Sequence, residues 1–287
     1  MPGVGIVADS SACLPSELAE RYGIKVVPLQ LIVDGRVYLD GVDITPTEFY
    51  GMLPRARKLP TTSASSPGSY VEAFRRVSQQ SSSIVCITVS KALSAIFDSA
   101  RSAAETAMGM FSGLTIEVVD SGTAAGADGW VVLAAARAAA AGGTHEQVVE
   151  AARSMKPRVH LLAVMDTLNY LAKGGRVPQV AAWASSLLQI KPVLRIVPEG
   201  GGVKLVSRPR TKRRAVNYML AATEKLAEGK PLHAIVHHSN APDEAEELKQ
   251  RVAARFKCEE VYVKDFTPAM GVHTGPGLLG IAFYAGN

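Results

Sequence analysis

Short apolar runs that end in polar turns and lead into helical patterns recur along the first half of the chain. Three of them, Val4–Ala8, Ile84–Val89 and Leu114–Val119, are of the kind found in buried strands. A stretch with apolar residues at helical spacing follows each polar turn, and the longest of these stretches runs from about residue 124 to 140. Strands that alternate with helices in this way predict a parallel sheet with helices on both faces.

Two local patterns add detail to this half. Asp34-Gly35 separates the extended stretches Ile24–Val33 and Arg36–Leu39, which is typical of a hairpin with a type I′ turn. Thr45 precedes a helical pattern over Pro46–Leu53 and predicts its start. The sequence therefore predicts a hairpin and a further helix outside the alternating strands and helices.

The second half has a different order of elements. Strands are predicted at 159–165, 192–197, 203–206, 233–237, 261–263 and 279–284, with helices at 166–172, 212–226 and 243–256. The glycine-rich stretch Glu199–Gly202 predicts a second hairpin. We therefore expect an α/β fold with two α/β domains, residues 1–156 with a mainly parallel sheet and residues 157–287 with a mixed sheet.

Hydroxyl side chains gather where the strands of the first half end. The stretch Pro60–Gly68 holds five hydroxyls in nine residues and runs into a helix start at Ser66. Other polar turns at strand ends are Asp9-Ser10, Ser90–Ser94 and Asp120-Ser121. In parallel sheets, ligands bind beyond the carboxyl ends of the strands, so these turns predict a site for an anion. The alternative for any one stretch is a flexible connector.

Composition narrows the class of protein. The chain has 287 residues, 47% of them hydrophobic, and a formal net charge of +5, which is small for a nucleic-acid-binding protein. Its three cysteines form no C-x-x-C pair, and Val4–Ala8 is too short for the core of a signal peptide. Trp130–Ala141 is too short to cross a membrane. We expect a cytoplasmic protein.

Several familiar cofactor motifs are excluded. Gly3, Gly5 and Ala8 match a dinucleotide-binding spacing but lie before and inside a predicted strand. A second such match at Gly275–Gly280 contains a proline and leads into a strand, and no P-loop or nucleophile-elbow sequence occurs. His237-His238 point to opposite faces of a strand, so we predict no metal site there and no cofactor.

Two glycine-rich motifs and one basic cluster remain as candidate sites. Gly174-Gly175 ends a helix and can direct Arg176 away from it, and Gly271–Gly277 predicts a rigid loop that displays His273 and Thr274. The basic cluster comprises Arg208, Arg210, Lys212, Arg213 and Arg214. It lies at a predicted helix start, where the dipole disfavours cations. A solvated surface, a nucleic acid and an acidic protein partner all remain possible explanations.

Taken together, these motifs resemble those of the DegV family of bacterial fatty-acid-binding proteins. The resemblance covers nearly the whole chain and is carried by Ala8–Ser11, Thr62–Gly68, Leu93-Ser94, Asp120-Ser121, Asp166–Arg176, Ile190–Pro192 and Gly271–Gly277. It implies a long-chain fatty acid in a tunnel between the two domains. It also implies a carrier that is not itself an enzyme and presents the carboxylate to a partner ATP-dependent fatty-acid kinase, which forms an acyl phosphate for phospholipid metabolism.

The resemblance also implies which residues bind the ligand. Thr62 and Ser94 would hold the carboxylate, and Ser63, Ala95, Arg176, His273 and Thr274 would lie in the same region. We interpret the basic cluster as a docking surface for the kinase, with transient membrane contact possible and no nucleic acid expected. The competing hypothesis is a hydrolase or acyltransferase that uses Ser94 or Thr62 with His273.

Overall fold

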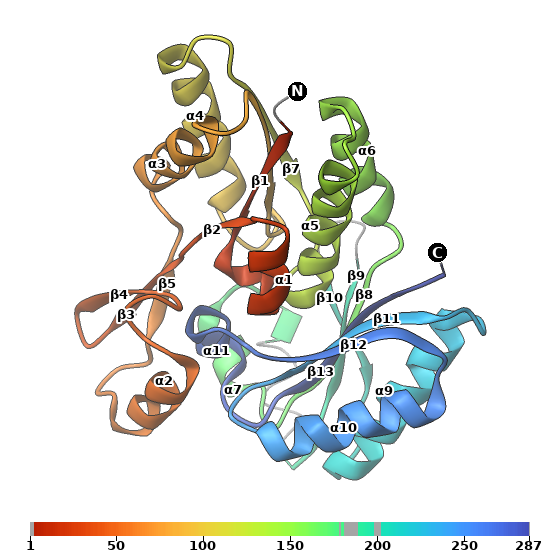
Figure 1. Cartoon of the computed structure of the whole chain (residues 1–287). Helices are drawn as coiled ribbons and strands as arrows, with labels where there is room; N and C mark the ends of the chain where they lie inside the picture. The colour runs from red at the N-terminus through yellow and green to blue at the C-terminus, as the bar shows by residue number, and fades with distance from the viewer. Residues whose placement is uncertain (1–2, 178, 181–188, 198–201, 287) are drawn as a thin grey trace.

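The structure is a computed structural model that describes residues 3–177, 179–180, 189–197 and 202–286. The described residues form three sheets with helices packed around them (Figure 1). One sheet lies in the upper part of Figure 1, a larger one lies below it, and a small sheet lies at the side. This arrangement confirms the predicted α/β class.

The first sheet is entirely parallel. Its strands are β1 (Val4–Asp9), β2 (Lys25–Val27), β6 (Ser83–Thr88) and β7 (Thr115–Asp120), in the order β2-β1-β6-β7. Helices α3 (Pro67–Ser78) and α4 (Ile96–Met110) pack on one face, and α5 (Ala125–Ala140) and α6 (His145–Met155) pack on the other. The short helix α1 (Ser16–Arg21) lies beside them. The predicted mainly parallel sheet is confirmed.

The small sheet was only partly predicted. Asp34 and Gly35 have φ of 48° and 86°, as a type I′ turn requires, and join β3 (Gln30–Val33) to β4 (Arg36–Leu39). The extended stretch expected over Ile24–Val33 is divided between two sheets, because the chain leaves the first sheet after β2 and begins β3 beyond Pro28. The third strand is β5 (Thr61–Ser63), so the hydroxyl-rich stretch begins as a strand.

Short helices accompany the small sheet and the end of β1. Thr45 caps α2 (Pro46–Met52) in a capping box with Glu48, as its sequence predicts. One-turn 3-10 helices, η1 (Ser10–Ala12) and η2 (Leu53–Arg55), follow β1 and α2.

The second sheet is mixed, as predicted. Its order is β10-β9-β8-β13-β11-β12, and only β11 and β12 are parallel neighbours. These strands are β8 (His160–Val164), β9 (Val193–Val197), β10 (Gly202–Ser207), β11 (Leu232–His238), β12 (Cys258–Asp265) and β13 (Leu279–Ala285). The pairing of β9 with β10 confirms the second hairpin, although Glu199–Gly201 of its turn lie outside the described residues.

Helices cover one face of the second sheet and leave part of the other face to the cavity described below. α9 (Lys212–Ala227) and α10 (Pro242–Arg255) pack on the first face. The short helices α7 (Asn169–Gly174) and α11 (Pro268–Thr274) contact each other near the first sheet. The prediction of a loop over Gly271–Gly277 was wrong for its first part, since residues up to Thr274 form α11.

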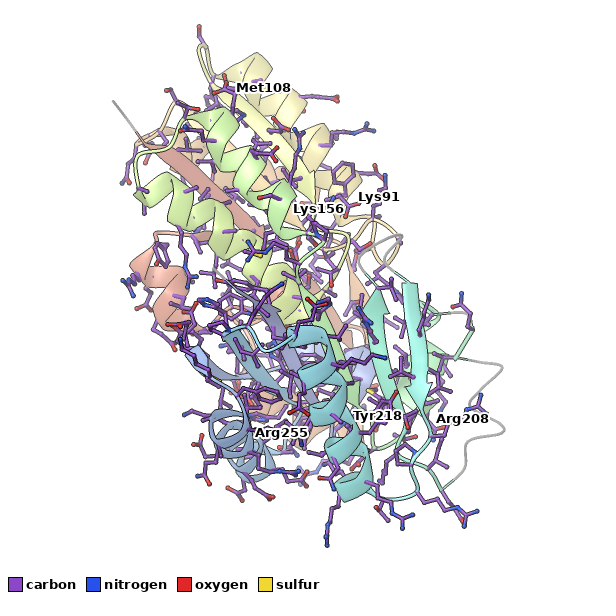
Figure 2. All side chains as sticks on the ribbon, turned by 90° about the vertical axis from the view of Figure 1, so that its right-hand side faces the viewer. Lys91, Met108, Lys156, Arg208, Tyr218 and Arg255 are labelled. Carbon is purple, nitrogen blue, oxygen red and sulfur yellow. The ribbon has the colours of Figure 1, made fainter. Side chains whose placement is uncertain are left out.

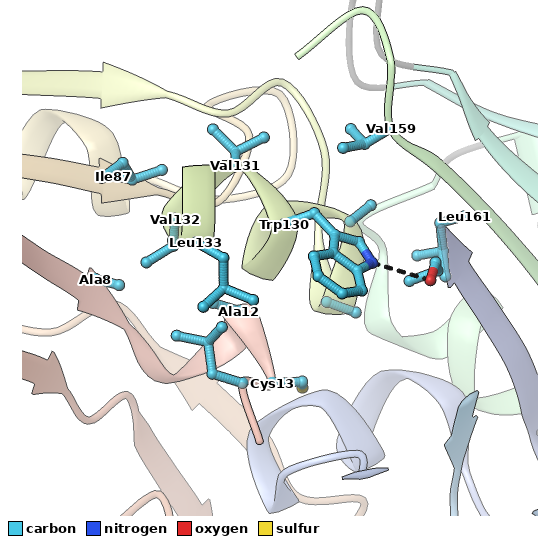
Figure 3. Close-up of a cluster of buried hydrophobic side chains, with 14 of the residues drawn as sticks. Ala8, Ala12, Cys13, Ile87, Trp130, Val131, Val132, Leu133, Val159 and Leu161 are labelled. Carbon is cyan, nitrogen blue, oxygen red and sulfur yellow. Dashed lines mark hydrogen bonds between the residues drawn. The ribbon is translucent and has the colours of Figure 1, made fainter. Parts of the chain in front are cut away.

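Helix α5 connects the first sheet to the second. Gly126 donates its N–H to His237 Nε2 over 3.0 Å. The indole of Trp130, drawn with its dashed hydrogen bond in Figure 3, donates to the carbonyl of Ala282 over 3.1 Å. Arg137 donates to Glu260 over 2.7 Å and 2.8 Å. Side chains of α5 therefore belong to one hydrophobic core with strands β8 and β13. The proposed division at residues 156 and 157 falls between α6 and β8 and stays a prediction.

Candidate functional site

A largely apolar cavity lies between the carboxyl end of the first sheet and the open face of the second. It encloses about 1010 Å³ of empty space, part of which is open to solvent. Its walls come from both halves of the chain.

The apolar part of the wall was not identified from the sequence. Neighbouring strands of the second sheet present side chains in register, since Leu161 pairs with Ile196 and Ile196 pairs with Val203. Ala163 pairs with Leu194 in the next row. Alternation along the strands directs these five side chains to the cavity, while Leu162 and Val164 face α9. The alternation could have indicated this face, but only the fold shows which side holds the cavity.

Six of the seven predicted binding residues line this cavity. They are Thr62, Ser63, Ser94, Arg176, His273 and Thr274. Ala95 is not part of the wall, although its neighbours Ser94 and Ile96 are. The fold thus brings together residues that lie up to 212 positions apart in the chain, from Thr62 to Thr274. Ser11, which was not among the predicted binding residues, also lines the cavity.

Thr62 and His273 form the best-defined polar contact of the wall. Thr62 is placed by the pairing of β5 with β3, and its Oγ1 lies 2.9 Å from Nε2 of His273 in α11. Burial, and to a smaller extent the Arg176 charge, lower the pKa of His273 to about 4. The imidazole is therefore neutral at neutral pH. If Nε2 donates to Thr62, the Thr62 hydroxyl keeps its own proton for a ligand.

Ser94 lies where α4 begins. Its Oγ accepts a hydrogen bond from the N–H of Ile96 over 3.4 Å, and the N-cap residue Ala95 offers no side-chain cap. The start of a helix has N–H groups without intrahelical partners and a positive dipole end. An anion near Ser94 would therefore meet both a hydroxyl and a favourable field.

The two glycine-rich motifs pack against each other, and the glycines are where the packing is tightest. A Cβ on Gly275 would lie 2.2 Å from the ring of Tyr170, and one on Gly277 would lie 2.3 Å from Asp166 Oδ2. Conversely, a Cβ on Gly174 would lie 2.7 Å from Nδ1 of His273. Distances under 3.0 Å exclude a side chain there unless a neighbour moves. We call this contact between residues 166–176 and 271–277 the glycine interlock; it sets the position of His273.

Arg176 and Thr274 lie at the edge of the interlock. Gly175 adopts a left-handed conformation with φ of 68° and ends α7, as predicted. Arg176 is exposed and donates to the carbonyl of Gly174 over 2.9 Å. Thr274 donates to the carbonyl of Met270 over 3.2 Å. Both side chains are in the cavity wall and have polar atoms available near His273.

The interlock is also connected to the basic cluster. Lys191 Nζ lies 3.0 Å from Asp166 Oδ1, and the Lys191 N–H donates to the carbonyl of Pro209 over 2.7 Å. Lys212 pairs with Glu244 and lies 3.9 Å from Asp166. Lys212 is thus half-buried and paired with carboxylates of the same chain.

The four arginines of the basic cluster are exposed and form no ion pair among the residues that the structure describes. Figure 2 shows Arg208 at the edge of the molecule near β9 and β10. The N-cap Thr211, which accepts from the N–H of Arg214 over 3.3 Å, starts α9 next to these cations. The dipole argument made from the sequence therefore applies to them.

The two adjacent histidines have other roles than metal binding. His237 accepts from Gly126 at Nε2, and its Nδ1 lies 3.1 Å from the carbonyl of Lys264. His238 contacts Asp265 over 2.7 Å and accepts from the N–H of Ala241. Within the described ranges, no three His, Cys, Asp or Glu side chains gather as a metal ion would require. No described helix has the length and apolar character needed to cross a bilayer.

The fold and the cavity define an α/β protein with a largely apolar cavity between its two larger sheets and polar groups around Thr62 and His273. The chain belongs to the DegV family: the family described as "Uncharacterised protein, DegV family" matches residues 3–286. A DegV domain-containing protein of Streptomyces coelicolor is 35% identical over 280 residues, which cover 97% of each chain.

Solved structures agree with this assignment. A DegV family protein from Thermus thermophilus, whose structure is described as showing fatty acid binding, is 31% identical with a TM-score of 0.89 over 99% of each chain. A stearic acid-binding protein from Eubacterium ventriosum is 26% identical with a TM-score of 0.89 over 98% of each chain.

Proposed function

We propose that this protein binds one long-chain fatty acid, with the acyl chain in the cavity and the carboxylate near Thr62 and Ser94. The observation that carries the proposal is the make-up of the cavity wall. Aliphatic side chains of the second sheet form one side, and hydroxyl groups of β5 and of the α4 start lie opposite. Structural relatives that bind fatty acids support the same conclusion.

The chemistry of the wall suits such a ligand. Each buried methylene contributes about 0.8 kcal/mol, so a long acyl chain gains on the order of 10 kcal/mol before the costs of association. A carboxylate only accepts hydrogen bonds, so the Thr62 hydroxyl must donate to it. His273 then donates from Nε2 to Thr62 and lies behind it. His273 thereby orients the hydroxyl that meets the ligand.

A carrier explains this arrangement better than a hydrolase does. A Ser–His hydrolase needs a base that is oriented by an acidic group and bonded to its nucleophile. Nδ1 of His273 is buried and has no hydrogen-bond partner in the described part of the chain. Ser94 accepts from the backbone, and His273 contacts Thr62 instead. These contacts favour a non-catalytic role for the site.

The proposal predicts that the protein purifies with about one fatty acid per chain, because an enclosed apolar ligand dissociates slowly. Native mass spectrometry of freshly purified protein should show the added mass, and extraction followed by gas chromatography should identify the acid. Delipidated protein should take up added fatty acid and protect it from extraction by vesicles. A preparation with no acyl chain and no uptake would contradict the proposal.

We further propose that the carrier presents the carboxylate to a partner ATP-dependent kinase, for use in phospholipid synthesis. The basic cluster is the proposed docking surface, and its exposed part is Arg208, Arg210, Arg213 and Arg214. Lys212 has an internal role, since it pairs with Glu244. Docking through exposed charges mainly accelerates encounter, so it should weaken as salt increases.

Replacing Arg210 and Arg213 by Ala should therefore slow kinase-dependent phosphorylation about tenfold at low salt and leave fatty-acid affinity unchanged. The matched control is Arg55→Ala together with Arg57→Ala, which removes two exposed cations near η2 that form no ion pair among the described residues. Phosphorylation rates are measured over a salt series and acid binding is measured separately. Equal rates for the cluster variant and the parent protein would identify the cluster as an ordinary solvated surface.

A further inference from the structure

Three aspartates are buried around the carboxyl end of β1, and two of them have clear hydrogen-bond donors. Asp9 accepts from the N–H of Ser11 over 2.9 Å and from that of Val89 over 3.0 Å. Asp40 accepts from the hydroxyl of Ser10 over 2.6 Å and from the N–H of Ala269 over 2.9 Å. These donors favour the ionised carboxylate, although burial outweighs them and raises the pKa of both Asp9 and Asp40 above its ordinary value.

Asp128, in the first turn of α5, differs from both. It is fully buried, and neither carboxyl oxygen has a hydrogen-bond partner among the described residues. No lysine, arginine or histidine of the described chain forms an ion pair with it. An isolated ionised carboxylate in the protein interior is strongly unfavourable.

The groups around Asp128 add negative charge or none. Asp9 on β1, Tyr70 on α3, Cys86 on β6 and Asp120 at the end of β7 face this region. The Tyr70 hydroxyl and Thr88 Oγ1 are also buried without partners. Burial first, and the Asp9 carboxylate second, raise the pKa of Asp128 well above its ordinary value. The Ser121 hydroxyl donates to the carbonyl of Thr123 over 3.4 Å, and its dipole lowers the pKa of Asp128 by less than burial and Asp9 raise it.

We propose that Asp128 is a proton-binding site of the folded protein and remains a neutral carboxylic acid at neutral pH. The carboxyl is fully buried and has neither a cation nor a hydrogen-bond donor within the described structure, so a proton would remove the uncompensated charge. Asp9, which accepts from three donors, is better placed than Asp128 to carry the negative charge of the pair. Neither the family resemblance nor the predicted ligand site involves Asp128.

The proton has a consequence for the cavity, and this part rests on the proposed function. Ser11 and Val89, which donate to Asp9, line the cavity, and so does Ala124, whose carbonyl accepts the Asp128 N–H over 3.4 Å. Ionisation of Asp128 would place a second negative charge behind this wall. An anionic ligand would then bind less tightly, while a neutral ligand of the same chain length would not.

The stability of the ligand-free protein tests the proton itself. In the unfolded chain Asp128 loses its proton near pH 4, whereas the folded protein keeps it, so stability falls as pH rises between the two pKa values. Asp128→Asn removes this dependence. We therefore divide the folding equilibrium constant of Asp128→Asn by that of the parent protein at each pH. Between pH 5 and 8 this ratio should increase by up to about tenfold per pH unit, because only the parent protein loses stability.

Asp243→Asn is the matched control, because Asp243 is exposed in the first turn of α10. The folding constant of Asp243→Asn divided by that of the parent protein should stay nearly constant over the same pH range. A constant ratio for Asp128→Asn as well would overturn the proposal, since Asp128 would then be ionised in the fold. Should Asp128→Asn not fold, Asp128→Leu takes its place, and the infrared band of a protonated carboxyl at pH 7 must disappear in that variant.

A second measurement tests the link to ligand binding. The affinity of the parent protein for a fatty acid should fall as the pH rises into the alkaline range, and that of Asp128→Asn should fall less. The fatty alcohol of equal length should show no such difference. If neither ligand binds, the proposed function is contradicted. The stability measurement then remains the test of whether Asp128 is protonated. If the fatty-acid affinities of the parent protein and of Asp128→Asn depend on pH in the same way, the proposed link between Asp128 and ligand binding is overturned.

Discussion

The combined replacement of Thr62 and Ser94 by Ala should weaken fatty-acid binding by about 2 to 5 kcal/mol, or roughly 30-fold to several thousand-fold. Each hydroxyl is expected to donate to the buried carboxylate, and a donor lost from a buried charged group costs about 1 to 3 kcal/mol. The single variants should each show part of the loss. His273→Ala should resemble Thr62→Ala, because His273 acts through Thr62.

Thr61→Ala is the matched control for this experiment. Thr61 lies on the same strand as Thr62, but it is exposed and lies outside the cavity wall. Its affinity should equal that of the parent protein in a titration with a fluorescent or isotopically labelled fatty acid. Unchanged affinity in the Thr62, Ser94 and His273 variants would show that the carboxylate lies elsewhere.

Trp130→Ala should destabilise the whole protein by about 3 to 5 kcal/mol, the usual cost of removing a large buried aromatic side chain. Trp130 is fully buried, with its ring centre 5.2 Å from that of Tyr284 and 6.1 Å from that of His233. Such a loss is a large part of the stability of a typical domain, about 5 to 15 kcal/mol. Urea unfolding followed by circular dichroism measures it.

Trp130→Phe separates the contribution of the apolar contacts of Trp130 from that of its hydrogen bond. The phenyl ring keeps most of the apolar contacts and loses the hydrogen bond to the Ala282 carbonyl. Its destabilisation should therefore be clearly smaller than that of Trp130→Ala. A loss below 1 kcal/mol in Trp130→Ala would mean that α5 contributes little to holding the two sheets together.

Local pattern was enough to predict many of the regular elements of the fold, although it missed β5, α6 and α11. Apolar runs such as Ile84–Val89 are buried in the first sheet because successive side chains point to opposite faces and helices cover both faces. The turn at Asp34-Gly35 and the cap at Thr45 depend on chemistry within a few residues. The glycine-bearing motifs marked residues that the fold does bring to one cavity.

Features that depend on distant contacts could not be predicted in this way. Helix α11 is only seven residues long and contains Gly271, and its contacts with distant side chains were not visible from the sequence. A Cβ on Gly271 would lie 2.5 Å from the hydroxyl of Tyr50, which shows how closely that distant side chain approaches. Asp128 lies within an apolar helical pattern, and only the fold places it next to Asp9.

The contacts of α5 with the second sheet also bear on how quickly a bound molecule can leave. Moving the two sheets apart would break buried contacts at Gly126, Trp130 and Arg137. The opposite wall depends on α7 and α11, which are only six and seven residues long. Exchange of ligand should thus require a local opening of these short helices. Its rate should respond to changes in the glycine interlock, while the two sheets keep their relative orientation.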